Sequence, residues 1–237
     1  MGLIFVYDTE TSGLPLFRDP SDDPRQPHIV EAAALLVDTE TRQIIDEFEA
    51  ISRPDGWEIP DDVAAIHGIT TARALQDGIP EAEIVARLYT MWLRADEGRV
   101  AHNETFDARI LRIGIKRFFS GGGADDAWKY GRALCTANGC TGIVKLPPTP
   151  KMVAAGRTHH KTPNLAEAYR HFSGEDFEDA HRAMADAKAC LRIHWGIVDH
   201  YDGAPPAPKP KTEKPAPAAR PAAAAVPLDD DGLGFLS

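Results

Sequence analysis

Cysteine is scarce in this sequence, and long apolar runs are missing from it. The 237 residues include 3 cysteines, and an odd number argues against a disulfide framework and for a reducing compartment. No stretch approaches the ~20 consecutive apolar residues that a membrane-spanning helix needs. Asp8 interrupts the apolar N-terminal run too early for a secretory leader. We therefore expect a cytoplasmic protein that has no membrane segment.

The spacing of cysteine and histidine argues against a structural zinc site. Cys135 and Cys140 form a C-x4-C pair, and His159 is followed directly by His160. Zinc sites usually combine C-x2–4-C with H-x3–5-H, so the histidine spacing does not fit. We interpret Cys135 as a small buried residue that closes a strand, and the two histidines as loop residues.

Acidic residues, by contrast, are abundant, and four of them stand in short motifs with one histidine. The motifs are D-T-E-T-S-G, which contains Asp8 and Glu10, H-N-E-T-F-D, which ends at Asp107, and H-R-A-M-A-D, which runs from His181 to Asp186. Crowded carboxylates repel one another, so a site that gathers four of them is expected to hold cations. Hard divalent cations prefer oxygen ligands, and a pair of them can clamp the two oxygens of a phosphoryl displacement.

The flanking residues indicate where each acid lies. Residues 3–7 are apolar, β-branched or aromatic, as in a buried central strand. Side chains alternate along a strand, so Asp8 and Glu10 should share one face at its C-terminal end. Asp107 falls in the first turn of a helix that starts near Asn103, a good N-cap residue, and the helix dipole favours a carboxylate there.

The third motif cannot lie on one helical face. His181 and Asp186 are separated by about 140° of rotation on an ideal α-helix. We therefore expect Asp186 on a helix and His181 on a mobile segment that leads into it.

These segments resemble the DEDDh branch of the DEDD exonuclease superfamily, which holds the DnaQ-like proofreading subunits, ribonuclease T and oligoribonuclease. Its motifs D-x-E-T-[ST]-G, H-N-x-x-F-D and H-x-x-x-x-D all stand here in order. Residues 66–70 also look like the family's H-G-I-T segment, and residues 164–169 look like its N-L-x-x-x-Y stretch. The resemblance covers about residues 1–200, and residues 135–156 look most like bacteriophage members.

The resemblance implies a metal-dependent 3′→5′ exonuclease that releases nucleoside 5′-monophosphates from DNA 3′ ends in replication, repair or proofreading. It implies two divalent ions, Mg²⁺ or Mn²⁺. Asp8, Glu10 and Asp186 would hold the first, and Asp8 would bridge to a second that Asp107 supports. His181 would accept the proton of the attacking water, since an imidazole ordinarily titrates near pH ~6.5.

The resemblance also suggests contacts to single-stranded or frayed 3′ ends. The candidate substrate-binding residues are Thr11, Leu14, His67, Asn103 and Phe106. Ordinary structural roles, as cap or core residues, are the alternative for these side chains. Two other functions stay open at this point: an exoribonuclease of the ribonuclease T or oligoribonuclease type, and a non-catalytic module that binds nucleic-acid ends and recruits partners.

The expected architecture is an α/β, ribonuclease H-like fold with a central mixed five-stranded sheet flanked by helices. The pattern predicts strands at residues 3–8, 29–37, 43–51, 100–101 and 132–135. It predicts helices at residues 80–93, 104–118, 164–172 and 182–200. Residues 141–162 are predicted to be a long loop.

The chain divides into an exonuclease domain at residues 1–203 and a tail at residues 204–237. The tail is rich in Pro and Ala up to residue 227, so it is predicted to be disordered. Its acidic and apolar end, Leu228 to Leu236, suggests a peptide that docks on a replication protein, although a frayed end without a partner is the alternative.

Charge is distributed unevenly. The formal net charge is −10, and the tail is neutral, so residues 1–203 carry all of it. Proteins that bind long nucleic acid non-specifically are usually basic, so this acidic domain suggests contact with a few nucleotides at a strand end. Lys145, Lys151, Arg157 and Lys161 gather in the 141–162 stretch, where they either follow a phosphate backbone or are solvated loop charges.

Overall fold

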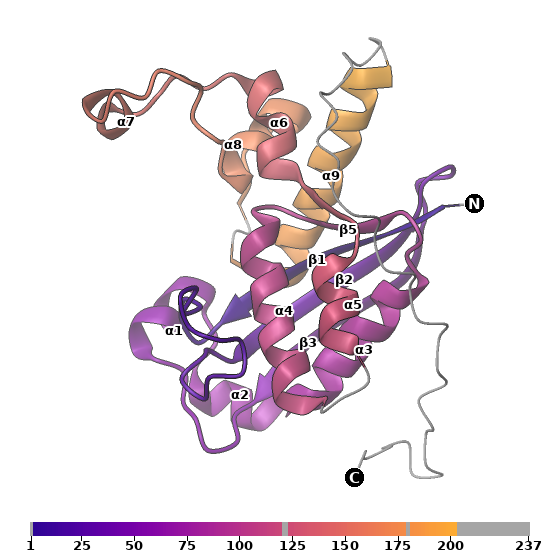
Figure 1. The fold of residues 1–237 in the computed structure, drawn as a ribbon, viewed down its shortest axis with the longest axis vertical. Helices are drawn as coiled ribbons and strands as arrows, with labels where there is room; N and C mark the ends of the chain where they lie inside the picture. The colour runs from indigo at the N-terminus through magenta and orange to yellow at the C-terminus, as the bar shows by residue number, and fades with distance from the viewer. Residues whose placement is uncertain (1, 120–122, 179–180, 203–237) are drawn as a thin grey trace.

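A six-stranded sheet forms the centre of the computed structural model, which describes residues 2–119, 123–178 and 181–202 (Figure 1). The strand order is β4-β3-β2-β1-β5-β6. The strands are β1 (Leu3–Thr11), β2 (Ile29–Asp38), β3 (Ile44–Arg53), β4 (Ile79–Pro80), β5 (Gly98–Ala101) and β6 (Ala133–Cys135). β1, β2 and β3 pair antiparallel, while β5 joins β1, β6 joins β5 and β4 joins β3 in parallel.

The predicted mixed sheet in an α/β fold is confirmed, but the count of five strands is wrong by one. The extra strand, β4, has only two residues and contains a proline. A segment this short cannot show a period-2 pattern, so β4 could not be predicted from alternation.

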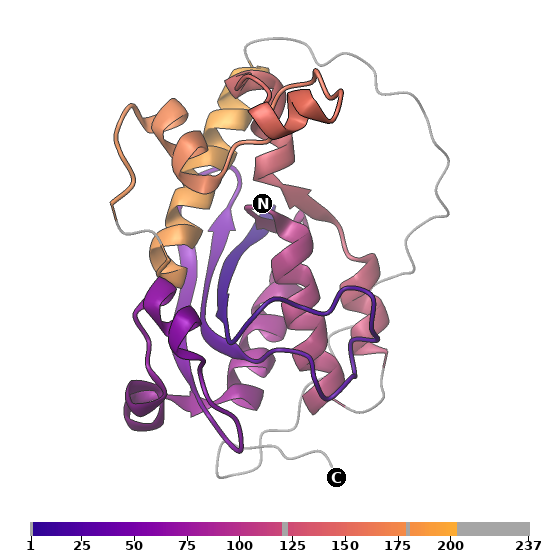
Figure 2. The ribbon, with the colours of Figure 1, turned by 90° about the vertical axis from the view of Figure 1, so that its left-hand side faces the viewer.

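Helices cover both faces of the sheet (Figures 1 and 2). One face carries α3 (Glu81–Arg94), α4 (Glu104–Phe118) and α5 (Ala124–Tyr130), and the other carries α9 (Ala183–Asp202), against which α6 (Thr136–Val144) and α8 (Leu165–Ser173) pack. The bounds of α3, α4, α8 and α9 agree with the four predicted helices to within two residues. Short helices that the pattern did not predict are α1 (Asp61–His67), α2 (Thr71–Asp77), α5, α6 and α7 (Pro150–Ala154). The end of α6 and all of α7 lie in the predicted loop at 141–162, and the rest of that loop is irregular or turn.

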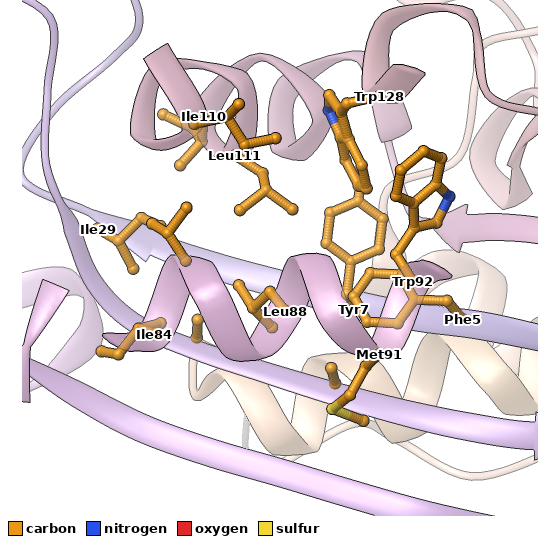
Figure 3. Close-up of a cluster of buried hydrophobic side chains, with 14 of the residues drawn as sticks. Phe5, Tyr7, Ile29, Ile84, Leu88, Met91, Trp92, Ile110, Leu111 and Trp128 are labelled. Atoms are coloured by element: carbon orange, nitrogen blue, oxygen red, sulfur yellow. The ribbon is translucent and has the colours of Figure 1, made fainter. Parts of the chain in front are cut away.

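β1 supplies side chains to two separate cores because it lies in the middle of the sheet. Phe5 and Tyr7 point toward α3, α4 and α5 (Figure 3), while Ile4 and Val6 point toward α9. In the first core the ring of Trp128 meets Tyr7 edge to face, with centroids 5.6 Å apart. Burial on both faces explains why β1 reads as a continuous apolar run, and it fixes the register of the acids that follow.

One predicted helix start is right in position and wrong in mechanism. α4 begins at Glu104 directly after Asn103, but Asn103 adopts a left-handed conformation (φ 66°), and within the described chain its side chain makes no capping hydrogen bond. Asparagine tolerates this conformation better than most residues. Asn103 therefore turns the chain from β5 into α4 rather than capping the helix.

No helix within the described ranges is both long and apolar enough to cross a membrane. Residues 203–237 lie outside the described residues. The predicted domain boundary at 203/204, the predicted disorder of the tail and the Leu228–Leu236 segment therefore stay predictions.

Gly114 allows α4 to approach α3 closely. A Cβ at this position would lie 2.6 Å from Cγ2 of Val85, which is buried and branched. We expect Gly114→Ala to lower the free energy of unfolding by about 1 kcal/mol, because overpacking costs ~1–3 kcal/mol and helical alanine recovers up to ~1 kcal/mol. Urea unfolding checks this, and a Gly114→Ala, Val85→Ala double variant should show less than additive loss. A stabilised Gly114→Ala protein would contradict the close packing.

Candidate active site

Three predicted residues meet where the C-terminal end of β1 faces the start of α9. Ligand atoms of Glu10, His181 and Asp186 lie within 4.8 Å of one another. Glu10 is half-buried, Asp186 is buried and His181 is exposed. Glu10 lies more than 170 positions before His181 and Asp186 in the sequence, and the packing of α9 on β1 brings the three together.

Asp8 lies on the same face of β1 as Glu10, as strand alternation predicted. Desolvation raises the pKa of Asp8 well above its ordinary value, and the negative charges of Asp107, Asp186 and Glu10 raise it further. Asp8 is therefore central to the carboxylate cluster.

Asp107 reaches the cluster from the other side of β1. Its Oδ1 accepts hydrogen bonds from the hydroxyl of Thr9 at 2.8 Å and from the Thr9 backbone N–H at 3.0 Å. Burial in the first turn of α4 nevertheless raises the pKa of Asp107 to about 8. These two hydrogen bonds orient the carboxylate and lower its pKa, but the opposing effect of burial is larger.

Burial also raises the pKa of Glu10 and of Asp186, each to about 7, with repulsion from neighbouring carboxylates as a second cause. Within the described chain, the buried Oδ1 of Asp186 accepts no hydrogen bond. A hard divalent cation takes carboxylate oxygens as ligands, so it would offset the repulsion in this cluster and give the unpaired buried oxygen a partner. The residues present therefore fit a divalent metal centre.

The geometry confirms that His181 precedes the helix that carries Asp186. His181 adopts a left-handed conformation (φ 70°), and its backbone N–H donates to Oδ2 of Asp186 at 3.3 Å. Its side chain is exposed at the rim of the cluster. This placement suits a group that exchanges protons with solvent, although its role as a base stays a prediction.

Sequence reasoning missed Glu31, a fifth carboxylate beside this cluster. Glu31 lies on β2 directly opposite Glu10 and is 1% exposed. It accepts hydrogen bonds from the guanidinium of Arg182 at 2.8 and 3.2 Å and from the backbone N–H of Ala183 at 3.0 Å. A glutamate inside the apolar run of residues 29–37 was the available signal. Glu31 thus ties the first residues of α9, next to His181, to the sheet.

The predicted substrate-binding residues fall into two groups. Leu14 is 80% exposed and Asn103 is exposed, so both can meet a ligand. Thr11 is buried and its hydroxyl donates to the carbonyl oxygen of Gly13 at 2.8 Å, while Phe106 packs partly buried against the α3–α5 core. The observed contacts of Thr11 and Phe106 are therefore structural.

His67 lies near the cluster despite its distance in sequence. It is buried, and its Nδ1 accepts from the backbone N–H of Ile69 at 3.1 Å. Its Nε2 is buried and has no hydrogen-bond partner among the described residues. Burial lowers the pKa of His67, and the charges of Glu31 and His181 also act on it. His67 therefore presents an unused polar atom close to the candidate site.

The cysteines and histidines considered for zinc do not converge. Among the described residues, Glu10, His181 and Asp186 are the one set of three or more potential ligands whose atoms lie within 4.8 Å of one another, and it contains none of these cysteines and histidines. Cys140 is buried in the small core between α6, α8 and α9, Cys135 is half-buried, and His159 and His160 are exposed.

Comparison with known proteins identifies the family to which most of this chain belongs. A model of the RNase_T family, described as Exonuclease, matches residues 5–194. This chain belongs to that exonuclease family. The match contains all five motif residues and confirms the predicted exonuclease family, in which dependence on divalent metal ions is general.

Individual relatives agree with this assignment. The chain is 31% identical over 112 residues to a PolC-type DNA polymerase III of Bacillus cereus. This match spans 47% of this chain and 7% of that protein. Its fold is similar to that of Escherichia coli Exonuclease I in complex with a dT13 oligonucleotide (TM-score 0.66, 18% identity, 86% of this chain and 42% of that one). Exonuclease I from Methylocaldum szegediense is also similar (TM-score 0.59, 18% identity, 86% and 41%).

The chain thus spans less than half the length of each of these proteins. At such low identity the two solved structures show the fold alone. They confirm the ribonuclease H-like architecture that the motifs predicted.

The metal-free exonuclease domain should lose stability as the pH rises. The pKa of Glu10 and Asp186 is about 7 and that of Asp107 about 8, whereas unfolded Asp and Glu titrate near ~4. Between these values the folded state binds more protons, so the free energy of unfolding falls with pH. Urea unfolding in a chelator at pH 5.5, 7.0 and 8.5 checks this, and Mg²⁺ should stabilise most at pH 8.5. A free energy of unfolding that rises from pH 5.5 to pH 8.5 would contradict the raised pKa values of these carboxylates.

Removing the charge of Glu31 should slow the exonuclease. Glu31→Gln keeps an acceptor for Ala183 but loosens Arg182, and loss of such supporting contacts typically costs ~10–100-fold in activity. Single-turnover rates on a labelled oligonucleotide measure the effect.

Glu81→Gln is the matched control. Glu81 is also buried, accepts from the backbone N–H of Ile29 and pairs with Arg117, but it lies on α3, on the other face of the sheet from α9. Both variants should lose stability, and only Glu31→Gln should lose rate. Equal rates for the two variants would remove Glu31 from any positioning role.

Proposed function

We propose that this protein is a 3′→5′ exonuclease that releases nucleoside 5′-monophosphates from single-stranded or frayed DNA 3′ ends, in replication, repair or proofreading. The observation that carries the proposal is the convergence of Glu10, His181 and Asp186, with Asp8 and Asp107 adjoining, inside a chain of the exonuclease family.

The carboxylates of this chain would act as ligands for two ions, Mg²⁺ or Mn²⁺. Glu10, Asp186 and Asp8 would hold one, and Asp8 and Asp107 the other. When bound, such ions supply charge stabilisation for an in-line phosphoryl displacement. The hydrogen bonds from Thr9 hold Asp107 in place for this task.

His181 would take the proton of the attacking water. Its ring is exposed at the rim of the cluster, so it can pass the proton to solvent. Glu31 and Arg182 hold the adjoining backbone, and the Asp186 carboxylate accepts the His181 N–H. These contacts would fix the position of His181 as the proposed base.

The terminal nucleotide would lie against Leu14, whose apolar side chain is almost fully exposed beside the cluster-bearing strand. The buried Nε2 of His67 would have to become accessible before it could contact the sugar or the 3′ hydroxyl. DNA is the favoured substrate because the solved structures of similar fold include oligodeoxynucleotide complexes and because a DNA polymerase is a relative.

Digestion of 5′-labelled strands with Mg²⁺ tests the proposal. Single-stranded DNA should shorten from its 3′ end faster than duplex, because an unpaired end needs no melting, and a chelator should abolish release. Asp8→Ala should be inactive, and His181→Ala should be ~10²–10⁴-fold slower. His171→Ala, an exposed histidine on α8, is the control and should retain the full rate.

Three outcomes would change the proposed function or the proposed site. Cleavage of closed circular single-stranded DNA at a comparable rate would show an endonuclease. Faster digestion of RNA than of DNA would show an exoribonuclease, and full activity of Asp8→Ala would remove that residue from the site.

A further inference from the structure

One segment of this acidic domain has no acidic residue. Residues 127–166 contain no Asp or Glu, although the chain has 36 of them, and the same segment contains Lys129, Arg132, Lys145, Lys151, Arg157 and Lys161. Two of these cations are occupied locally: Lys129 lies over the ring of Tyr130, and Arg132 pairs with Glu97. The remaining four gather on one projecting part of the fold.

That part is an arm formed by residues 145–161. Its base is closed where the backbone N–H of Lys161 donates to the carbonyl oxygen of Leu146 at 3.1 Å. Its tip is α7, which Thr149 caps by accepting from the N–H of Met152. Figure 1 shows α7 standing away from the sheet and its covering helices. No residue of α7 belongs to a hydrophobic cluster of the described chain.

The charges of the arm are turned to solvent. Lys145, Lys151 and Arg157 are exposed, and none of the three forms an ion pair within the part of the chain that the structure describes. Lys161 differs, because it pairs with Glu167 at the base. Ordering a segment costs conformational entropy, which an arm without packed apolar contacts does not recover from its own fold. Contacts between these cations and a binding partner would offset the entropy cost of ordering the arm.

The root of the arm is anchored to the active-site elements. The carbonyl oxygen of Pro163 contacts Nε2 of His102 at 3.2 Å, and His102 directly precedes Asn103 and the helix that carries Asp107. On the other side, α6 packs on α9 near Ile193, which is about 10 Å along the helix axis from Asp186. At ~3.4 Å per stacked nucleotide, that distance corresponds to about three nucleotides.

We propose that the arm binds the phosphodiester backbone of the substrate strand, three or more nucleotides upstream of the 3′ end. This inference rests on the proposed exonuclease function. The acidic cluster repels a polyanion except where cations intervene, so a separate cationic element holds the strand while the end enters the site. Lys145, Lys151 and Arg157 make the contacts.

Substrates of different length distinguish an effect on the arm from an effect on the active site, because a trinucleotide is too short to reach the arm. We compare a Lys145→Gln, Lys151→Gln, Arg157→Gln protein with a control of equal charge, Arg53→Gln, Lys129→Gln, Arg132→Gln, whose residues are exposed and lie off the arm. The arm variant should lose about tenfold in kcat/KM on a 20-nucleotide strand and nothing on a trinucleotide. The control should lose little on either substrate. Thermal melting verifies that both proteins fold.

Binding of the 20-nucleotide strand in a chelator gives a second readout. The slope of log Kd against log salt should shrink by about 2 in the arm variant, since each phosphate contact on a single strand contributes ~0.7. Equal losses in both triple variants, or a loss on the trinucleotide as large as on the long strand, would overturn the proposal. So would binding of a 20-residue polyglutamate as tight as that of DNA. If the wild-type protein cleaves neither substrate, the proposed function fails, and an arm-dependent slope in the binding assay still decides for or against the arm.

Discussion

Repulsion among buried carboxylates is the constraint on which the rest of this structure depends. Burial raises the pKa of Asp8, Glu10, Asp107 and Asp186, and repulsion from neighbouring carboxylates raises each of them further. Such a cluster opposes folding at neutral pH unless cations compensate it. The packing of α9 on β1 holds the cluster together, and divalent cations would compensate its charge.

Two features of the fold hold this cluster together. β1 is buried on both faces, so its register cannot slip without moving apolar side chains out of two cores. α9 is fixed at its start by Glu31, which joins Arg182 and Ala183 to β2. The fixed register of β1 and the anchored start of α9 therefore bring Asp186 close to Glu10 and leave His181 at the rim of the cluster.

The sequence predicted the parts of the site that lie on regular elements. Asp8 and Glu10 followed from strand alternation, Asp107 from a helix start, and the separation of His181 from Asp186 from helical rotation. It did not predict Glu31, because one acid in a buried strand carries no periodic signal. The left-handed turn at Asn103 and the short elements β4, α1, α2 and α7 were missed for a related reason: tertiary contacts, rather than local pattern, determine them.

Proton release on metal binding tests the central claim most directly. Calorimetric titration of Mn²⁺ into the protein at pH 6.5, in buffers of different ionisation enthalpy, counts the protons displaced as the ions bind. If carboxylates with a pKa of about 7 to 8 are the ligands, binding should release about one proton or more per protein, and Asp8→Ala should release fewer. Saturable binding without proton release, or the same release from Asp8→Ala, would contradict the account.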